Sequence, residues 1–421
     1  MLGRLRPAAA LAAALGLVAL AAWPAAAATA RPEQPSWHAT QIRADRAHDA
    51  GYHGRGVVVA VLDGWVDARH ADFAGRVKSA ADCVGGTCRT KVTADGCGQH
   101  HGTHVAGTVT SSSYGVADLA TLMPVRVLAS DSSGECAGDP DDVAAGIRWA
   151  VAHGADVLNL SLGPDVPGLA TSSAIPTAVR EAAAKDVVVV FSAGNADLPV
   201  AQAYGQDALV VAATGPSGAL ASYSQHGQGV SVAAPGGEPT SSDVCSPRRC
   251  VTSLYAGNQY AVAAGTSMAA PHVAGLAALL RAAHPTWTGT QVRDRITATA
   301  RPLDGAGAGL VDAAAALGVR SVKKASPRPS PTRKPVVRTG SSPRPRPVAT
   351  ATPRRTAAPV VIPTPAPTRA TAPSTASPTP APVLAEPPLV STDEDVPVAL
   401  AAVAGLLVGL AATGVLVLPR L

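Results

Sequence analysis

GTSMAAPHVAG, at residues 265–275, opens a run of small and apolar residues that continues to Leu279. The run has the length and composition of a buried helix rather than of a strand. Ser267 therefore lies at a helix N-terminus, where unpaired N–H groups and the positive end of the helix dipole can stabilise a nearby oxyanion. Serine is also a common helix N-cap, so the rest of the chain has to distinguish a nucleophile from a cap.

Apolar strands alternate with helical stretches between residues 57 and 213. The pattern predicts strands at 57–63, 122–128, 157–161, 187–193 and 208–213, and helices at 101–109, 140–153 and 173–185. Continuous apolar runs indicate strands that are covered on both faces. The expected fold class is therefore α/β, a doubly wound and mostly parallel sheet with helices on both faces.

Polar residues follow the ends of two predicted strands. Asp63 ends the first strand, and Asn195 lies just beyond the strand at 187–193. Functional sites in such sheets gather outside the carboxyl ends of the strands. Both side chains are therefore expected at one site.

Three histidines, His100, His101 and His104, lie at the start of the predicted helix at 101–109. Imidazoles three residues apart on a helix can share a metal ion. No carboxylate stands at the spacing of a zinc motif. We therefore expect no metal and no cofactor.

The two ends of the chain have the composition of membrane-targeting segments. Residues 1–30 show the basic, apolar and small-residue regions of a secretory signal peptide, and the apolar run is short for the alternative, a permanent anchor. Residues 398–418 contain no charge and would span about 31 Å as a helix, enough to cross a bilayer core of about 30 Å. The alternative of a buried core helix has no following segment to cover it. With Arg420 following, residues 419–421 form a cytoplasmic stub and the folded part lies outside.

A proline-rich linker, residues 321–397, separates the folded domain, residues 31–320, from this span. The linker holds 18 of the chain's 37 prolines within 321–390 and is expected to be a disordered tether. The domain has 20 Lys and Arg against 25 Asp and Glu, although the whole chain carries a net charge of +5. The basic excess belongs to the linker, so nucleic acid is not an expected partner.

All six cysteines lie inside the domain, which is consistent with disulfides in an oxidising exterior. Six cysteines allow 15 pairings, and sequence alone does not select among them. Short loops favour Cys83 with Cys88 and Cys245 with Cys250, which would leave Cys97 for Cys136. The alternative of a metal site lacks regular spacing and a histidine pair.

Five motifs together resemble the subtilisin-like serine proteases, over residues 37 to about 317. They occur in the order and approximate spacing of that family: VLDGWVDARHADF at 61–73, HHGTHVAGTV at 100–109, NLSLG at 159–163, FSAGN at 191–195 and GTSMAAPHVAG at 265–275. A single motif would be moderate support, whereas five in series are specific.

The resemblance implies a role for each motif. It implies that Ser267 is the nucleophile, that His101 is the general base and then acid, and that Asp63 orients the imidazole. Asn195 and the backbone N–H of Ser267 would form the oxyanion hole. Two segments would line the first specificity pocket: Ser161, Leu162 and Gly163, and Ser192, Ala193 and Gly194.

The chain departs from the family pattern in two places. Gly64 and Trp65 follow Asp63 where the family usually has Ser or Thr and then Gly, so another donor must hold the carboxylate. The stretch HVAGTVTSSSYGVA is too short for the loop that binds calcium in many relatives, so no structural calcium is implied.

Acidic residues cluster where the family's substrate-binding edge strand is expected: Glu135, Asp139, Asp141 and Asp142. They suggest a mild preference for basic residues upstream of the cleaved bond. The alternative is a solvated loop with a helix cap.

The sequence thus predicts a membrane-anchored extracellular serine endopeptidase that acts on peptide or protein substrates. Its signal peptide, tether and span are also similar to the architecture of the mycosins, the anchored subtilisin-like proteins of type VII secretion. That similarity implies an alternative in which the chain stabilises a secretion-system membrane complex with other membrane proteins, and catalysis is secondary. An inactive binding module is disfavoured because no catalytic position is substituted.

Overall fold

The computed structural model describes residues 36–93, 97, 100–130, 136–163, 172–200, 206–240 and 244–320, together with the short segments 18–19 and 26–28. The expected tether at 321–397, span at 398–418 and stub at 419–421 lie outside these residues, as does most of the expected signal peptide at 1–30. In the segments that are described, no helix combines the length and apolar character needed to span a bilayer.

A seven-stranded parallel sheet forms the centre of the fold, in the order β11-β10-β9-β8-β3-β5-β4. The strands are β3 (Val58–Asp63), β4 (Ala81–Asp82), β5 (Thr121–Arg126), β8 (Val157–Leu160), β9 (Val188–Ser192), β10 (Ala208–Thr214) and β11 (Val232–Pro235). The parallel α/β sheet expected from the sequence is confirmed. Two strands, β4 and β11, are too short to have been recognised by their apolar pattern.

Both faces of the sheet are buried, as β3 illustrates. Val59 and Val61 belong to one hydrophobic cluster, whereas Ala60 and Leu62 belong to another. Successive side chains of a strand point to opposite faces, so the two clusters are the two faces of the sheet. An uninterrupted apolar strand is the expected consequence.

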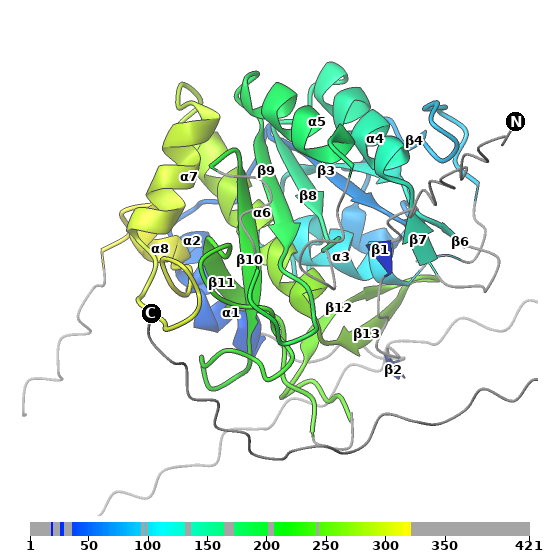
Figure 1. The fold of residues 1–421 in the computed structure, drawn as a ribbon. Coiled ribbons are helices and arrows are strands. Elements are labelled where there is room, and N and C mark those ends of the chain that lie inside the picture. Colours follow the sequence, from blue (N-terminus) through cyan, green and yellow to red (C-terminus); the bar gives the residue numbers. More distant parts are fainter. Residues whose placement is uncertain are drawn as a thin grey trace, which may run out of the picture. The chain divides into compact units, whose positions relative to one another are not determined.

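Helices cover both faces of the sheet (Figure 1). Helices α3 (His101–Thr110) and α6 (Thr266–Ala283) pack on one face, and α4 (Pro140–Ala152) and α5 (Ala174–Ala183) pack on the other. The bounds of α4 follow its sequence signals: the Asp139 side chain accepts a hydrogen bond from the backbone of Asp141, and Pro140 is the first helical residue.

The remaining helices add to the hydrophobic cluster on the face covered by α3 and α6. They are α1 (Trp37–Gln41), α2 (Ala44–Asp49), α7 (Gly289–Ala298) and α8 (Ala313–Ala316), with a short 3-10 helix, η1, at Ala71–Phe73. Helix α7 begins with a capping box, in which Thr288 and Gln291 exchange side-chain and backbone hydrogen bonds. Helices α2 and α8 pack against each other.

Two small antiparallel sheets flank the central one. Strands β12 (Val251–Tyr255) and β13 (Gln259–Ala263) form a hairpin that also pairs with β2 (Ala26–Ala28), and β6 (Ala129–Ser130) pairs with β7 (Cys136–Gly138). Strand β1 (Val18–Ala19) adds to the other edge of β7. An extended segment can therefore pair with β7.

The structure contains the three disulfides expected from loop length: Cys83–Cys88, Cys97–Cys136 and Cys245–Cys250. Two of them close loops of five residues. The third joins the segment before α3 to β7, two regions 39 residues apart.

Three buried histidines lie around α6, and each has a depressed pKa. Burial lowers the pKa of His104 to about 3 and that of His272 to about 4. Burial, together with the neighbouring His272, holds the pKa of His38 well below its usual range. Nδ1 of His38 lies 2.9 Å from Nε2 of His272, whose own Nδ1 lies 2.8 Å from the Met268 carbonyl oxygen. These two contacts are compatible with both rings being neutral.

We expect the protein to lose stability in mild acid because of these histidines. Each is neutral when folded but protonated in the unfolded chain below about pH 6.5. The unfolded state then binds more protons, so the free energy of unfolding should fall as the pH drops from about 6.5 toward 4, by up to about 1.4 kcal/mol per pH unit and histidine. Urea titrations across this range, in a Ser267→Ala variant that cannot digest itself, measure the slope.

The matched control is His153→Ala, because His153 is an exposed ring stacked on Trp149. This change should leave the slope unaltered. The pKa of His101 is raised in the fold, so its contribution to stability is already complete below about pH 6.5 and does not change the slope across this range. Stability that stays constant or increases between pH 6.5 and 4.5 would contradict the prediction.

Candidate active site

Asp63 is the last residue of the central strand β3, and its side chain is completely buried. The backbone N–H of Gly64 donates to its Oδ1 at 2.7 Å. Gly64 has no side-chain hydroxyl to support the carboxylate, and its backbone N–H supplies the donor instead. Gly102 brings the following helix close, since a methyl group there would lie 2.8 Å from the Trp65 carbonyl oxygen.

His101, the first residue of α3, points its ring at this carboxylate. Its Nδ1 lies 2.9 Å from both Asp63 oxygens. Because a carboxylate only accepts, Nδ1 carries the proton and Nε2 holds the free lone pair. Burial lowers the pKa of His101, but the charge of Asp63 and its hydrogen bond outweigh burial, so the pKa is raised above its usual value.

The other two histidines of the motif have separate partners. His104 donates from Nε2 to the Val251 carbonyl oxygen at 3.1 Å, and His100 stacks on Tyr255 with 3.8 Å between ring centroids. His101 contacts Asp63, so each of the three rings contacts a different part of the protein.

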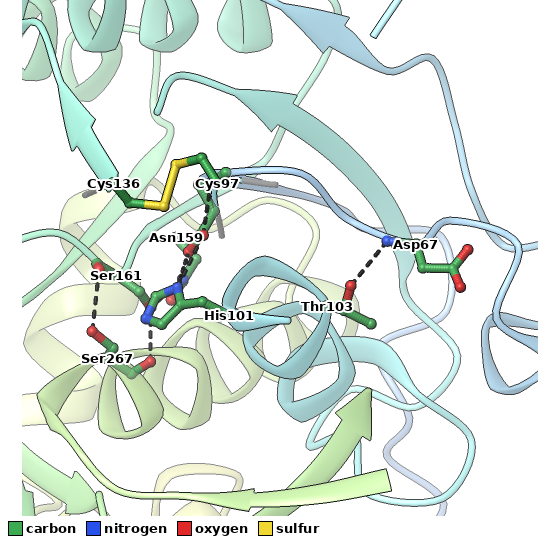
Figure 2. Close-up of polar contacts among 10 residues, drawn as sticks. Asp67, Cys97, His101, Thr103, Cys136, Asn159, Ser161 and Ser267 are labelled. Atoms are coloured by element: carbon green, nitrogen blue, oxygen red, sulfur yellow. Dashed lines mark hydrogen bonds and ion pairs between the residues drawn. A yellow bond between two sulfur atoms is a disulfide. The ribbon is translucent and has the colours of Figure 1, made fainter. Parts of the chain in front are cut away.

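The loop after Asp63 is tied to α3 by a hydrogen bond from the Asp67 N–H to the Thr103 hydroxyl, at 2.9 Å (Figure 2). Helix α3 thus contacts the loop through the Thr103–Asp67 hydrogen bond and contacts Asp63 through His101. These two contacts fix the position of the imidazole relative to the carboxylate.

Ser267 lies in the first turn of α6 and is 6 % exposed. Gly265 is the N-cap, so the serine is not serving as the cap. Figure 2 shows the side chains of His101 and Ser267 pointing toward one another. The Ser267 hydroxyl donates to the Ser161 carbonyl oxygen at 3.2 Å, and the Ser161 hydroxyl donates to the Ser267 carbonyl oxygen at 2.8 Å.

Asn195 approaches the start of α6 through its side-chain amide. Its Oδ1 accepts from the N–H of Thr266 at 2.9 Å and from the Thr266 hydroxyl at 3.0 Å. Two donors on one atom fix the orientation of the amide and leave Nδ2 available. A methyl group on Gly265 would lie 3.6 Å from this Nδ2 and 3.7 Å from the Ser267 nitrogen, so the two nitrogen donors converge beside Gly265.

Thr266 is a functional residue that the sequence analysis did not single out. Its hydroxyl accepts from the Gly194 N–H at 3.0 Å while donating to Asn195. One side chain therefore joins the segment after β9 to the serine helix. The sequence signal that could have identified Thr266 is its position directly before Ser267.

The two predicted pocket segments follow β8 and β9 and lie side by side. A methyl group on Gly163 would be 2.9 Å from the Ser192 carbonyl oxygen and 3.0 Å from the Gly194 nitrogen. Ser161, Leu162, Ser192 and Ala193 are buried. These segments therefore present mainly backbone at the site.

The acidic cluster is largely engaged elsewhere. Asp139 caps α4, and Asp142 accepts hydrogen bonds from the backbone of Gly85 and Gly86 in the Cys83–Cys88 loop. Glu135 lies outside the described residues. Asp139 is therefore a helix cap, which is the alternative that the sequence analysis gave.

Comparison with known proteins agrees with this geometry. Residues 54–325 match the model of the subtilase family. The chain belongs to that family. This subtilase is 36% identical to M-protease of Shouchella clausii over 301 residues, which cover 68% of the chain and 71% of that protein. It is 37% identical to subtilisin BL of Lederbergia lenta over 293 residues, 66% of the chain and 97% of that protein.

Solved structures show the same relationship. A protease from Pseudoalteromonas arctica is 32% identical and superimposes with a TM-score of 0.58, covering 69% of this chain and 99% of the other. A cold-adapted subtilisin-like serine proteinase is 29% identical with a TM-score of 0.51, covering 62% and 89%. The subtilase is therefore a subtilisin-like serine protease.

We expect Thr266→Val to lower turnover by about three- to tenfold with little change in KM. Valine keeps the volume but leaves the Gly194 N–H unpaired and removes one of the two bonds that orient Asn195, at a cost of about 1 kcal/mol. Steady-state kinetics on a peptide amide measure the effect. Thr266→Ser keeps the hydroxyl and is the matched control, so equal turnover of the Val and Ser variants would contradict the assignment.

Proposed function

We propose that this subtilase is a membrane-anchored extracellular serine endopeptidase that uses an Asp63–His101–Ser267 triad. The observation that carries the proposal is the His101 imidazole, which donates from Nδ1 to a buried carboxylate and presents its free nitrogen toward the start of α6. A nucleophile, a base and a group that orients the base are the parts that nucleophilic catalysis requires.

The first step is proton transfer from the Ser267 hydroxyl to Nε2 of His101. The hydroxyl has one hydrogen, which it now shares with the Ser161 carbonyl oxygen, so it must rotate toward the imidazole. The raised pKa of His101 favours the imidazolium that results. Asp63 stabilises that cation without taking the proton itself.

Oγ of Ser267 then adds to the carbonyl carbon of the substrate, and the carbonyl oxygen becomes an oxyanion. Nδ2 of Asn195 and the N–H of Ser267 supply the two donors. The Ser267 N–H lies in the first helical turn, where N–H groups have no partner within the helix. The positive end of the α6 dipole acts in the same direction.

Collapse of the tetrahedral intermediate breaks the C–N bond. His101 gives its proton to the leaving amine, which leaves an ester between Ser267 and the acyl half of the substrate. Water, deprotonated by the same imidazole, then attacks the ester, and the proton returns to Ser267. One peptide bond and one water become an acid and an amine.

An extended substrate would pair with the edge of β7 near the site. The pairing of Val18 with Gly138 and of Ala19 with Ala137 supports this, because it is an antiparallel addition to the same edge. Backbone hydrogen bonds of this kind accept many sequences. Side-chain preference would then come from the pocket beside the segments 161–163 and 192–194.

Secretion and anchoring are proposed from the terminal segments. The signal peptide at 1–30 would direct the chain outward, and residues 398–418 would hold it in the membrane. Three disulfides in the domain support an oxidising compartment.

A fluorophosphonate probe should label the full-length protein at Ser267. Ser267→Ala should abolish labelling, and Asp63→Asn should slow it by about 10⁴-fold, because the imidazole loses its required tautomer. Asn195→Ala should reduce turnover of a peptide substrate by about 10²–10³-fold, as the loss of an oxyanion-hole donor does in subtilisin. Gel fluorescence and amide hydrolysis provide the two measurements.

The same experiment addresses the alternative, a mycosin-like component that stabilises a secretion complex. A folded parent that is not labelled would move that alternative to first place. Membrane complexes that are lost on deletion of the gene but kept in Ser267→Ala would support it further. Labelling of the parent together with rates lowered in the variants supports the endopeptidase.

Deletion of residues 398–418 should move the protein from the membrane fraction to the medium, because no other segment is expected to be both apolar and long enough to cross a bilayer. The matched control removes 21 tether residues, 351–371, and should remain in the membrane. Protein that stays in membranes without 398–418 would contradict the anchor.

A further inference from the structure

A group of two imidazoles and one carboxylate lies apart from the proposed catalytic residues. His48 comes from α2, His53 follows five residues later, and Asp118 belongs to the loop between α3 and β5. One ligand atom of each lies within 4.8 Å of the others. The proposed proteolysis uses none of the three.

The distances suit a small ion. Nδ1 of His53 is 2.8 Å from Oδ1 of Asp118, and Nε2 of His48 is 3.9 Å from the same oxygen. A tetrahedral ion with bonds of about 2.0–2.1 Å places its ligand atoms about 3.4 Å apart. The distance from His53 to Asp118 must lengthen and the distance from His48 to Asp118 must shorten, each by about half an ångström. Small side-chain rotations are enough for both changes.

The backbone around the group is held in place. The N–H of Leu119 donates to the His53 carbonyl oxygen at 2.9 Å, so the two ligand-bearing segments are joined directly. Gly54 has φ +77°, and a methyl group there would lie 2.8 Å from Cβ of Ala117. Only glycine allows the segments to approach this closely. The site is therefore preorganised rather than assembled from mobile loops.

The imidazoles are also oriented alike. The rings of His48 and His53 stack at 5.3 Å between centroids and 13° between planes. An ion pair between His53 and Asp118 accounts for one imidazole. The second, His48, donates to the Val116 carbonyl oxygen and also lies 3.9 Å from the same carboxylate oxygen. A shared cation would use both imidazoles at once.

An ion could enter the group and complete its coordination there. The side chains of His48, His53 and Asp118 are 27%, 32% and 23% exposed. The Val116 carbonyl oxygen is 2.8 Å from Nε2 of His48 and at present accepts its proton. On binding, the metal would replace that proton, and the carbonyl oxygen or a water would take the fourth position.

We propose that His48, His53 and Asp118 bind one divalent transition-metal ion, of which Zn²⁺ is the best fit, and that the ion joins α2 to the loop between α3 and β5. Two imidazole nitrogens and one carboxylate suit Zn²⁺, Co²⁺, Ni²⁺ or Cu²⁺, whereas Ca²⁺ and Mg²⁺ prefer oxygen ligands throughout. The role is structural, because the ligands hold two segments together and contact no proposed catalytic group. This revises the expectation, drawn from the sequence, that the chain binds no metal.

The test uses full-length protein in the Ser267→Ala background, which prevents self-digestion and makes the result independent of catalysis. After EDTA treatment, calorimetric titration with Zn²⁺ should give one ion per chain, and Zn²⁺ should raise the melting temperature. Co²⁺ should give visible absorption bands that Zn²⁺ abolishes. His53→Gln and Asp118→Asn should each weaken binding at least tenfold.

Two controls separate this site from other histidines. His226→Gln removes a partly exposed histidine 3.6 Å from Asp197, a pair that no third metal-ligating side chain joins among the described residues, and should leave Zn²⁺ affinity unchanged. His101→Ala removes the histidine of the proposed triad and should also leave it unchanged. Loss of binding in His101→Ala would assign the ion to the catalytic site and overturn the proposal.

Binding that survives His53→Gln and Asp118→Asn would overturn the proposal, as would a parent that binds no Zn²⁺. If circular dichroism shows that a variant does not fold, the deciding measurement is the pH dependence of Zn²⁺ binding by the parent protein. Its Zn²⁺ affinity should fall by more than tenfold between about pH 7 and pH 5, because the imidazoles must lose their protons. Affinity that does not change with pH would exclude imidazole ligands.

Discussion

The burial of helix α6 against the central sheet is the constraint on which the rest of the structure depends. Every residue from Thr266 to Leu280 is buried, and the helix packs on β8, β9, β10 and β11. Small residues also allow close packing against the segment between α3 and β5: a methyl group on Gly275 would lie 2.5 Å from Cβ of Val116. Because the helix is packed along its length, its N-terminus is held in place too, and Ser267 is carried on a buried element.

The sheet order then explains why the polar residues meet. The chain leaves β3 for β5 on one side and later returns to β8 on the other. Asp63 ends β3, and the two backbone segments after β8 and β9 lie beside it at the same edge. This is the switch point at which open α/β sheets form their sites. A buried carboxylate there is costly unless it is paired, and Gly64 and His101 together satisfy it.

How far the sequence could predict this depends on the range of each interaction. The five longer strands and the central helices were predicted because continuous apolar runs report burial on both faces. The positions of Asp63, His101 and Ser267 followed from motifs. Loop length favoured two of the disulfides, which left the third pair by elimination. The link made by Thr266 was missed because it depends on contacts with Gly194 and Asn195, which are about 70 residues away in the chain. The approach of Asp118 to His53, 65 residues apart, leaves no local pattern either.

The N-terminal strap, residues 36–49, is held in place by distant contacts of the same kind. Trp37 donates to the Cys250 carbonyl oxygen at 3.1 Å, His38 pairs with His272 of the serine helix, and Arg43 forms a 2.6 Å ion pair with Asp312. These contacts reach three separate parts of the domain. Loss of the strap would remove one polar partner from buried His272 and one from buried Asp312, which is costly. Cleavage near residue 30 would leave every one of these contacts in place. The strap contacts are therefore compatible with the cut near residue 30 that the sequence analysis predicts, and the cut itself stays a prediction.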